Sequence, residues 1–426
     1  MNETIIIVGY VGGAVDAFDG LQPEGSVVWV EEPDVVRKRG ARVELDHSPF
    51  VRALVEWEHY LPGKADEFYL RHRDLDPVAV IPLTEYATPF AARLAERYRL
   101  PGAGFAAAQI LRDKALLRQV SAAAGVANPE SVRVENPAQV RAFMQRIGGP
   151  IVLKPANRQA AVGTQIIHDA GDVEDAWEAC IRQDEGPRVP DRPIELRMLA
   201  ERYVAGTEYS CEMLVRAGTR VWANVSGKQL FAGDRPVESG HVVPADIPDT
   251  LAELLAAHTE LVVGAADFRD GIVHCEWIVS GGTPYLVECA GRLPGDGLIG
   301  LISRAYPVQL LHAYYALLKG RPLPDLPQRA KGAAAIRFLD APHGVVTAVH
   351  GVDDAREAAG VVSVEVDTAP GDRFDGLRSS WDRAGDVVVV ADTPAEALDR
   401  AAAAAALVRI EAQPADQAAK AAAGQL

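Results

Sequence analysis

Residues 274–292 form the segment that most constrains the fold, because they predict two β-strands joined by a tight turn. Two apolar, alternating runs flank residues 280–283, whose central Gly281 and Gly282 suit a two-residue hairpin loop. A turn centred on these glycines places Glu276 opposite Val287 or Glu288. The sequence therefore predicts a hairpin that carries carboxylates on both strands.

The predicted hairpin has two chemically different faces. Side chains alternate along a strand, so Glu276, Glu288 and Arg292 can share one face, with Trp277 and Cys289 on the other. Like charges directly across a ladder repel each other. A divalent cation between the two carboxylates removes the repulsion, as in Mg²⁺ sites that also bind substrate phosphates. The alternative is a solvated hairpin whose glutamates point into water.

The length and net charge of the chain limit its domain organisation and its binding partners. A length of 426 residues exceeds one comfortable hydrophobic core, so several domains are expected. The net charge of −16 argues against an extended nucleic-acid-binding surface, although backbone amides, lysines and Mg²⁺ can still neutralise ATP locally. The start of the chain lacks a basic signal-peptide region, and no apolar run approaches the ~20 residues that span a bilayer. We expect a cytoplasmic protein that binds neither nucleic acid nor membrane.

The spacing of the cysteines also indicates a reducing compartment. They show no CxxC or other metal-binding spacing, so buried free thiols in a reducing compartment are expected. The four residues are Cys180, Cys211, Cys275 and Cys289.

The first quarter of the chain alternates strands and helices. Apolar strands at 4–9, 26–31 and 78–82, with the glycine loop 9–13 after the first, predict a Rossmann-like layer. The loop is not the full dinucleotide fingerprint, so a tight turn between strand and helix is favoured over NAD binding. Residues 1–105 are therefore predicted to form one α/β domain.

The rest of the chain predicts further α/β and α+β domains. The proline-rich stretch 319–328 cannot continue a helix or a sheet, so we expect a linker there. The predicted units after the first are 106–195, 196–325, a small α+β domain at 330–412 and a flexible tail at 413–426.

Two lysines lie at positions that suit phosphate binding. Lys154 ends an apolar strand, and a buried lysine is costly unless it meets an anion. A phosphate is the natural partner, with the following loop 155–163 folding over it. The alternative is a surface lysine whose stem covers apolar atoms while its charge reaches water. Lys114 lies at the start of a predicted helix.

Residues 199–214 carry three more candidate carboxylates. Glu201 precedes a crossover whose backbone amides could read an adenine edge. Glu208 lies beyond the turn at Gly206, where a carboxylate can accept hydrogen bonds from ribose hydroxyls. Glu212 shares a face with Glu208 and could equally be solvated.

The order of these motifs resembles the ATP-grasp superfamily of carboxylate–amine ligases, and most closely its L-amino-acid ligase branch. Residues 82–85 (PLTE) and 237–244 (VESGHVVP) are similar to substrate segments of that branch. The resemblance implies a pre-ATP-grasp domain at 1–105, a small lobe that covers the nucleotide at 106–195 and a large lobe with the metal and substrate site at 196–325. The matching motifs are Asp113-Lys114, Leu153-Lys154-Pro155, residues 201–208, Glu276 and residues 288–292.

The resemblance also implies roles for single residues at the nucleotide. Lys114 and Lys154 would contact the ATP phosphates, beneath a loop that ends at Gly163. Glu276 and Glu288 would hold Mg²⁺, one ion or two, with Mn²⁺ as a possible substitute. The residues implied at the adenine are Glu201 and the backbone of Arg202 and Val204, and the residue implied at the ribose is Glu208.

Further roles are implied at the substrate. Arg292 would stabilise the acyl phosphate and its tetrahedral successor, with Lys154 and His241 also taking part in catalysis. Glu85, Glu238, His241 and Asp296 would line the amino-acid pocket. For His241 the alternative is a structural histidine, and for Asp296 it is a solvated loop residue.

The chain departs from the family pattern in two places. Ala290 stands where the family usually has an asparagine, and a methyl group offers a metal no oxygen. The loop 156–163 lacks the usual serine and most of the glycines, although Arg158 could add positive charge.

The predicted reaction follows from the resemblance. A carboxylate, expected to be that of an amino acid, attacks ATP to give an acyl phosphate, and an amine then displaces phosphate to form an amide or dipeptide. The alternatives are an ATP-grasp carboxylase that uses bicarbonate and a non-catalytic ATP-binding protein. The implied partners are small-molecule carboxylates and amines. Homodimers are common among such enzymes, and the sequence leaves the oligomeric state open.

Overall fold

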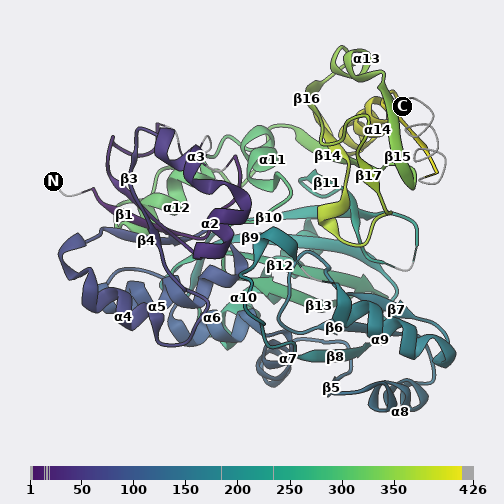
Figure 1. Ribbon diagram of the computed structural model, residues 1–426, viewed down its shortest axis with the longest axis horizontal. Coiled ribbons are helices and arrows are strands. Elements are labelled where there is room, and N and C mark those ends of the chain that lie inside the picture. The colour runs from purple at the N-terminus through teal and green to yellow at the C-terminus, as the bar shows by residue number, and fades with distance from the viewer. Residues whose placement is uncertain are drawn as a thin grey trace, which may run out of the picture.

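The computed structural model describes residues 3–414, apart from positions 14, 16, 17, 19, 184 and 234. Most of the predicted tail at 413–426 therefore lies outside the described residues. Figure 1 shows the first sheet at one end of the molecule, the C-terminal elements at the other and the largest sheet between them. The mixed α/β multidomain fold agrees with the fold class predicted from the sequence.

The N-terminal domain is built on a parallel sheet of four strands in the order β3-β2-β1-β4. All residues of β1 and β2 are buried, as their continuous apolar sequences predict. Gly9 has a φ of 92°, and an added Cβ would lie 2.5 Å from the Thr84 hydroxyl, so the glycine loop is a tight turn. The elements are β1 (Ile5–Val8), β2 (Val27–Glu31), α2 (Pro33–Arg39), α3 (Ala41–His47), β3 (Val51–Glu56), α4 (Lys64–Arg71), β4 (Ala79–Pro82), α5 (Thr88–Tyr98) and α6 (Phe105–Arg112).

The small lobe has a four-stranded antiparallel sheet in the order β5-β8-β6-β7. Its strand β8 lies beyond residue 195, so the predicted boundary between the lobes is wrong by one strand. The sequence shows that a strand exists but not which sheet it joins, because pairing depends on distant residues. The elements are α7 (Lys114–Ala123), β5 (Ser131–Val134), α8 (Pro137–Ile147), β6 (Ile151–Pro155), β7 (Gln165–Ile167), α9 (Val173–Arg182) and β8 (Met198–Arg202).

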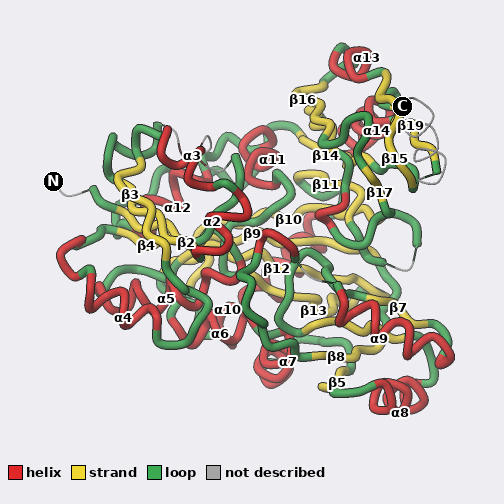
Figure 2. The backbone as a smooth tube through the Cα atoms, viewed as in Figure 1, coloured by secondary structure: helices red, strands yellow, loops and turns green. Residues whose placement is uncertain are grey.

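The largest sheet has eight strands in the order β13-β12-β9-β10-β11-β14-β18-β16. Its last three strands come from the region predicted as a separate C-terminal domain at 330–412, so that region shares a sheet with the large lobe. In Figure 2, β9, β10, β12 and β13 cross the middle of the molecule, and β11, β14 and β16 lie toward the C-terminal elements. The strands are β9 (Thr207–Arg216), β10 (Thr219–Leu230), β11 (Glu238–Val243), β12 (Gly271–Ser280), β13 (Thr283–Ala290), β14 (Ala333–Leu339), β16 (Val361–Val366) and β18 (Gly385–Ala391).

Helices and a small sheet complete the C-terminal half. Helix α12 lies against both β12 and β4, and Trp29 of the first domain shares a buried cluster with Trp222 of the large sheet. The N-terminal domain is therefore packed onto the large lobe. The remaining elements are α10 (Asp249–Ala265), α11 (Leu298–Ala305), α12 (Leu310–Leu318), α13 (Val352–Arg356), α14 (Pro394–Ala405) and the sheet of β15 (Gly344–His350), β17 (Arg373–Phe374) and β19 (Arg409–Gln413).

The predicted hairpin is confirmed as β12 and β13. Glu276 is the register partner of Glu288, one of the two pairings that the turn allowed. Gly281 and Gly282 both have positive φ, 56° and 82°, as a type I′ turn requires. Trp277 lies on the opposite face and is fully buried. A bulge follows Glu276 and shifts the register beyond it.

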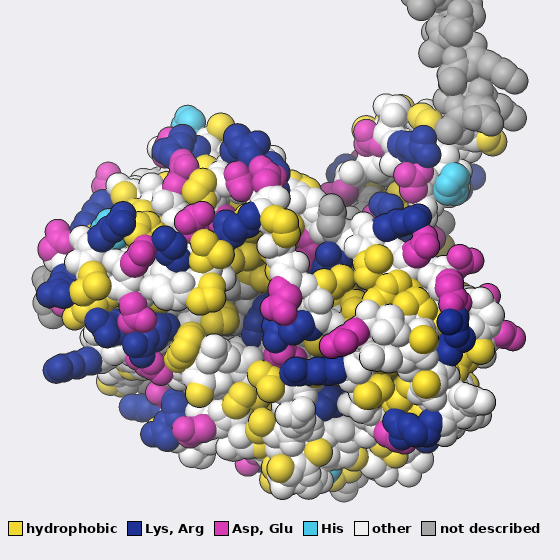
Figure 3. Space-filling view, turned by 60° about the horizontal axis from the view of Figure 1, so that its bottom comes forward, with side chains coloured by type: hydrophobic (Ala, Val, Ile, Leu, Met, Phe, Trp, Pro, Cys, Tyr) yellow, Lys and Arg dark blue, Asp and Glu magenta, His cyan; other side chains and the backbone are white. Residues whose placement is uncertain are grey.

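The prediction for the cysteines also agrees with the structure. All four cysteines are buried free thiols. None of the helices in the described part of the chain is both long and apolar enough to cross a bilayer. On the face shown in Figure 3, basic and acidic side chains intermingle.

Replacing Trp277 by alanine should destabilise the fold strongly. Its indole is fully buried and donates a hydrogen bond to the Thr259 hydroxyl at 3.0 Å. Truncation of a core tryptophan costs about 3–5 kcal/mol, so thermal denaturation should show a large drop in Tm. The control is Val43→Ala, at a side chain that is 70% exposed, where a change within about 0.5 kcal/mol is expected. Equal Tm values for the two variants would contradict the assigned packing.

Candidate active site

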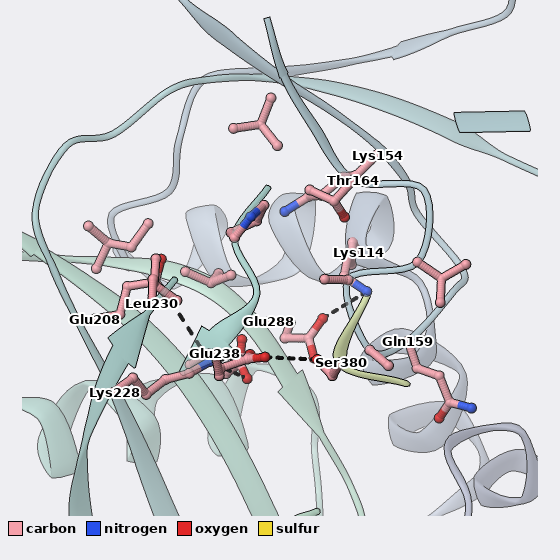
Figure 4. A pocket seen from close by; sticks show the side chains of 18 of the residues that line it. Lys114, Lys154, Gln159, Thr164, Glu208, Lys228, Leu230, Glu238, Glu288 and Ser380 are labelled. Atoms are coloured by element: carbon pink, nitrogen blue, oxygen red, sulfur yellow. Dashed lines mark hydrogen bonds and ion pairs between the residues drawn. The ribbon is translucent and has the colours of Figure 1, made fainter. Parts of the chain in front are cut away.

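A cavity of about 260 Å³ lies between the small lobe and the large sheet. Strands β6 and β8 line one side, and β9, β10, β12 and β13 line the other. Figure 4 shows Lys114 and Lys154 entering from the small-lobe side, with Glu208, Lys228, Glu238 and Glu288 facing them from the large lobe. The structure thus brings most of the residues selected from the sequence into one cavity.

Lys154 is buried at the end of β6, where it meets a carboxylate. Its ammonium lies 2.6 Å from Glu201, whose other oxygen accepts from Arg118 at 2.7 Å. Burial alone would raise the pKa of Glu201, but Arg118 and Lys154 lower it to about 2. Burial lowers the pKa of Lys154 itself. Glu201 therefore stays charged and holds two cations beside the cavity.

Lys114 begins helix α7 and points into the same cavity. Asp113 caps the helix by accepting from the amides of Ala115 and Leu116 at 2.8 and 3.2 Å. The Lys114 ammonium lies 2.8 Å from Glu288 and donates to the Arg158 carbonyl at 2.8 Å. The Asp113-Lys114 pair thus fixes both the start of the helix and the direction of its first charged side chain.

Lys228 is a central residue that the sequence reasoning missed. Its side chain is 2% exposed, and its ammonium lies 2.8 Å from Glu276, 3.2 Å from Glu238 and 3.9 Å from Glu208. Burial opposes the charged form, but the three carboxylates raise the pKa well above the ordinary value. Lys228 lies near the end of strand β10. A lysine within a strand of mostly uncharged residues was the signal that the sequence offered for this site.

His274 was also not selected from the sequence. Its ring nitrogens lie 2.9 Å from Glu212 and 3.2 Å from Glu276. Burial lowers the pKa of the imidazole, but the two carboxylates raise it to about 10. Glu212, left open as a solvated residue, is instead fully buried and accepts from Ser210, Ser226 and Asn224. His274 is therefore a fixed positive charge beside Glu276.

Glu208 also lines the cavity, and burial and neighbouring carboxylates act against its charged form. Burial raises the pKa of its carboxyl to about 7, with Glu276 and Glu238 adding to the effect and Lys228 opposing it. The group therefore holds its proton to higher pH than an ordinary glutamate.

Arg292 lines the cavity and contacts Glu85. The Arg292 Nε donates to Glu85 at 2.9 Å, and Nη1 donates to the Leu293 carbonyl at 2.8 Å. Glu85, in the short helical turn Glu85–Ala87, is buried and is not among the residues that line the cavity. The structure thus places Glu85 behind Arg292, where it orients the guanidinium instead of lining the amino-acid pocket.

The C-terminal segment also reaches the cavity. Asp296 lies 3.0 Å from His241 and 2.5 Å from Arg383. Burial raises the pKa of Asp296, but His241 and Arg383 lower it far more. Ser380 donates to Glu238 at 2.8 Å (Figure 4). The sequence reasoning missed Ser380 and Arg383, which no local motif connects to the cavity.

Gly163 does not have the position over the phosphates that was predicted for it in the loop 155–163. The amide of Gly163 donates to the Gln183 side chain at 2.9 Å, and this glycine does not line the cavity. Its φ is 77°, and an added Cβ would lie 2.9 Å from the Cys180 carbonyl. Ala160 and Ala161, both with positive φ, line the cavity instead. Gly163 is thus required by a tight turn.

The hairpin carboxylates suit a hard divalent cation. Glu276 and Glu288 face the cavity from paired positions and supply oxygen ligands, which Mg²⁺ prefers. In the described ranges no group of three or more His, Cys, Asp or Glu side chains could hold a metal by itself. Ala290 lies opposite His274 and adds no oxygen. The residues fit a metal that takes its other ligands from phosphates and water.

Comparison with known families gives two matches. An ATP-grasp domain matches residues 147–299, and the L-amino acid ligase C-terminal domain 2 matches residues 337–413. Both matched regions contribute side chains to the cavity described above.

Individual proteins extend these matches. The alanine–anticapsin ligase of Bacillus subtilis (strain 168) is 25% identical over 370 residues, 76% of this chain and 77% of that protein. An L-arginine-specific L-amino acid ligase of Bacillus subtilis is 22% identical over 304 residues, with 71% and 72% covered. The crystal structure of an L-amino acid ligase from Bacillus licheniformis has a TM-score of 0.78 at 18% identity, covering 97% of this chain and 99% of that one.

Glu208→Gln should change how stability depends on pH in the ligand-free protein. The folded pKa of Glu208 is about 7 against an ordinary value of 4.5. Between these values the folded protein binds more protons at this site than the unfolded chain, so this group lowers stability as the pH rises. The difference in Tm, variant minus wild type, should therefore increase from pH 5 to pH 8. A constant difference would contradict the assigned environment.

Proposed function

This chain belongs to the ATP-grasp superfamily and carries the C-terminal domain of L-amino acid ligases, and from that premise we propose an ATP-dependent ligase that joins an amino-acid carboxylate to an amine. The product is an amide or dipeptide, released with ADP and phosphate. One observation carries the proposal: a single cavity is lined by two lysines, two paired glutamates and Arg292.

The nucleotide fits the end of the cavity nearer the small lobe. Val152, Ile166, Ile278 and Val287 line that region with apolar atoms, which suit the flat face of a purine. Arg202 and Val204 also line the cavity, and their backbone can read the adenine edge. Glu208 can accept hydrogen bonds from ribose hydroxyls once it is ionised.

The phosphates would extend toward the lysines. Lys154 and Lys114 reach the cavity from two different elements, so they can neutralise charge on neighbouring phosphates. Glu276 and Glu288 would hold Mg²⁺, which supplies further charge neutralisation when bound. Phosphoryl transfer depends mostly on positioning and on such electrostatic stabilisation.

The transfer itself forms one bond and breaks one. An oxygen of the substrate carboxylate attacks the γ-phosphorus, and the bond from that phosphorus to the bridging oxygen of ADP breaks. Arg292, oriented by Glu85, would stabilise the negative charge of the acyl phosphate.

The second step needs a neutral amine. The amine nitrogen attacks the carbonyl carbon of the acyl phosphate, phosphate leaves, and the nitrogen loses a proton. His241 is 2% exposed, its Nε2 faces Asp296, and its Nδ1 has no hydrogen-bond partner among the described residues. His241 lines the cavity, and we propose it or a pocket carboxylate as the base that accepts that proton.

Amino-acid-dependent release of phosphate from ATP and Mg²⁺ tests the reaction, with mass spectrometry identifying the product. Lys154→Ala and Glu288→Ala should each reduce kcat by at least about 100-fold, because each removes a charge that faces the phosphates or the metal. The control is Lys64→Ala, at a surface lysine paired with Glu67, where no change is expected.

The same assay separates the alternatives. Release that requires bicarbonate and no amine would indicate a carboxylase. Nucleotide binding without turnover across a broad panel of amino acids would indicate a non-catalytic protein. If both site variants retain full activity, the assignment of the cavity is wrong.

Removal of divalent cations should abolish phosphate release. The chain supplies carboxylate ligands but no complete metal cluster among the described residues, so the bound ion should exchange readily. Activity should return on addition of Mg²⁺ and also of Mn²⁺, which accepts the same oxygen ligands. Full activity after dialysis against a chelator would contradict the metal assignment.

A further inference from the structure

A second cavity of about 490 Å³ adjoins the candidate active site. It lies between helix α11 and the strands β14, β16 and β18. None of the residues proposed for the nucleotide or the metal lines it. Asp296, Ser380 and Trp381 line both cavities, so the two spaces meet at these side chains.

Trp381 is the only large side chain of the three at this junction. The residue is 41% exposed, and it lines the active-site cavity as well as the second cavity. An indole is a broad and rigid apolar group, so it blocks more of the junction than a serine or an aspartate can. The indole therefore lies between the two cavities as a partition.

The backbone around Trp381 is fixed by contacts with the large lobe. The Ser380 hydroxyl donates to Glu238 at 2.8 Å (Figure 4). Arg383 donates to Asp296 from both Nη atoms, at 2.5 and 3.1 Å, and its Nε donates to the Ser380 carbonyl at 2.9 Å. The segment that carries the indole is thus anchored before and after it, and it cannot shift without breaking these hydrogen bonds.

The ring of Trp381 is held by a residue from another part of the chain. The Arg188 guanidinium lies 3.9 Å from the centre of the ring, which is a cation–π contact. The carbonyl of Arg188 in turn accepts from the Tyr60 hydroxyl of the N-terminal domain at 3.3 Å. Because the backbone and the ring are both held, the partition is a fixed wall.

This wall borders the proposed amino-acid pocket. Glu238 and Asp296, the large-lobe contacts of the segment that carries Trp381, line the active-site cavity together with Arg292. The indole has no charge, so it offers a substrate side chain apolar contact and no ion pair. The side chain of an amino acid bound in that pocket would therefore meet an apolar wall of fixed position.

We propose that Trp381 is a specificity-determining residue that sets the upper size limit for the side chain of an amino-acid substrate. Amino acids with short, neutral side chains fit in front of the indole, whereas longer side chains collide with it. The second cavity offers space for longer side chains only when the indole is removed. This inference rests on the proposed ligase function and adds the substrate class.

Substrates of increasing size provide the test. Amino-acid-dependent phosphate release is measured with alanine, leucine, phenylalanine and tryptophan, each alone and with a panel of co-substrates. In the wild-type protein kcat/KM should fall steeply from alanine to tryptophan. Trp381→Ala should raise the ratio of kcat/KM for phenylalanine to that for alanine by at least about tenfold, because the size of a pocket discriminates to this degree.

This gain with a bulky substrate cannot arise from misfolding. Trp381→Leu keeps an apolar side chain and should give a smaller increase of the same ratio, which preserves the test if the alanine variant does not fold. Leu407→Ala is the matched control, because Leu407 is 42% exposed and lines neither cavity. Its ratio should equal that of the wild-type protein.

Refilling the second cavity shows where the longer side chains go. Ser363 lines that cavity from β16, the edge strand of the large sheet, and it shares a face with Glu365, which also lines the cavity. Ser363→Phe therefore adds a ring to the second cavity. Combined with Trp381→Ala, it should return the ratio to the wild-type value.

The possible failures are distinct. No amino-acid-dependent phosphate release with any substrate would overturn the ligase function and this inference with it. A wild-type protein that uses tryptophan as well as alanine, or an unchanged ratio in both Trp381 variants, would overturn the inference and leave the ligase function standing. A ratio that stays high after the second cavity is refilled would overturn it in the same way.

Discussion

The constraint on which the site depends is the placement of two glutamates opposite each other on one hairpin. Glu276 and Glu288 face the same cavity, and two unscreened carboxylates there would repel each other. Three cations from other elements prevent this: Lys228 and His274 lie against Glu276, and Lys114 lies against Glu288. Helix α7 and strand β10 must therefore converge on the hairpin, and the lobes are arranged around that convergence.

The continuous sheet explains how the C-terminal region takes part in the chemistry. Strand β14 pairs with β11, which carries Glu238 and His241. The pairing brings Ser380 and Arg383 to the cavity, although Ser380 lies 142 residues from Glu238 and Arg383 lies 87 residues from Asp296 in sequence. The N-terminal domain contributes through Glu85, which orients Arg292. Each unit of the chain thus supplies a contact that the others lack.

Features of the fold that depend on local patterns could be predicted from the sequence. Features that depend on contacts with distant residues could not. Two glycines and alternation narrowed the partner of Glu276 to Val287 or Glu288, and the apolar neighbours of Lys154 favoured its burial over a surface position. The boundary before β8 was wrong because a strand does not record which sheet it joins. Lys228 and His274 were missed because their importance comes from carboxylates on other strands. Gly163 was assigned to phosphate binding, whereas the constraint on it is a carbonyl from helix α9.

The cation pairs also have a consequence for ligand binding. In the protein without nucleotide, Lys114 is held by Glu288, and Lys154 is held by Glu201. A lysine cannot fully neutralise a phosphate while it shares its charge with a carboxylate. A divalent cation on Glu288 would release Lys114 toward the phosphates, and the phosphates would in turn add ligands to the cation. If the cavity binds as proposed, metal and ATP must therefore strengthen each other's binding, because each removes the electrostatic cost that opposes the other.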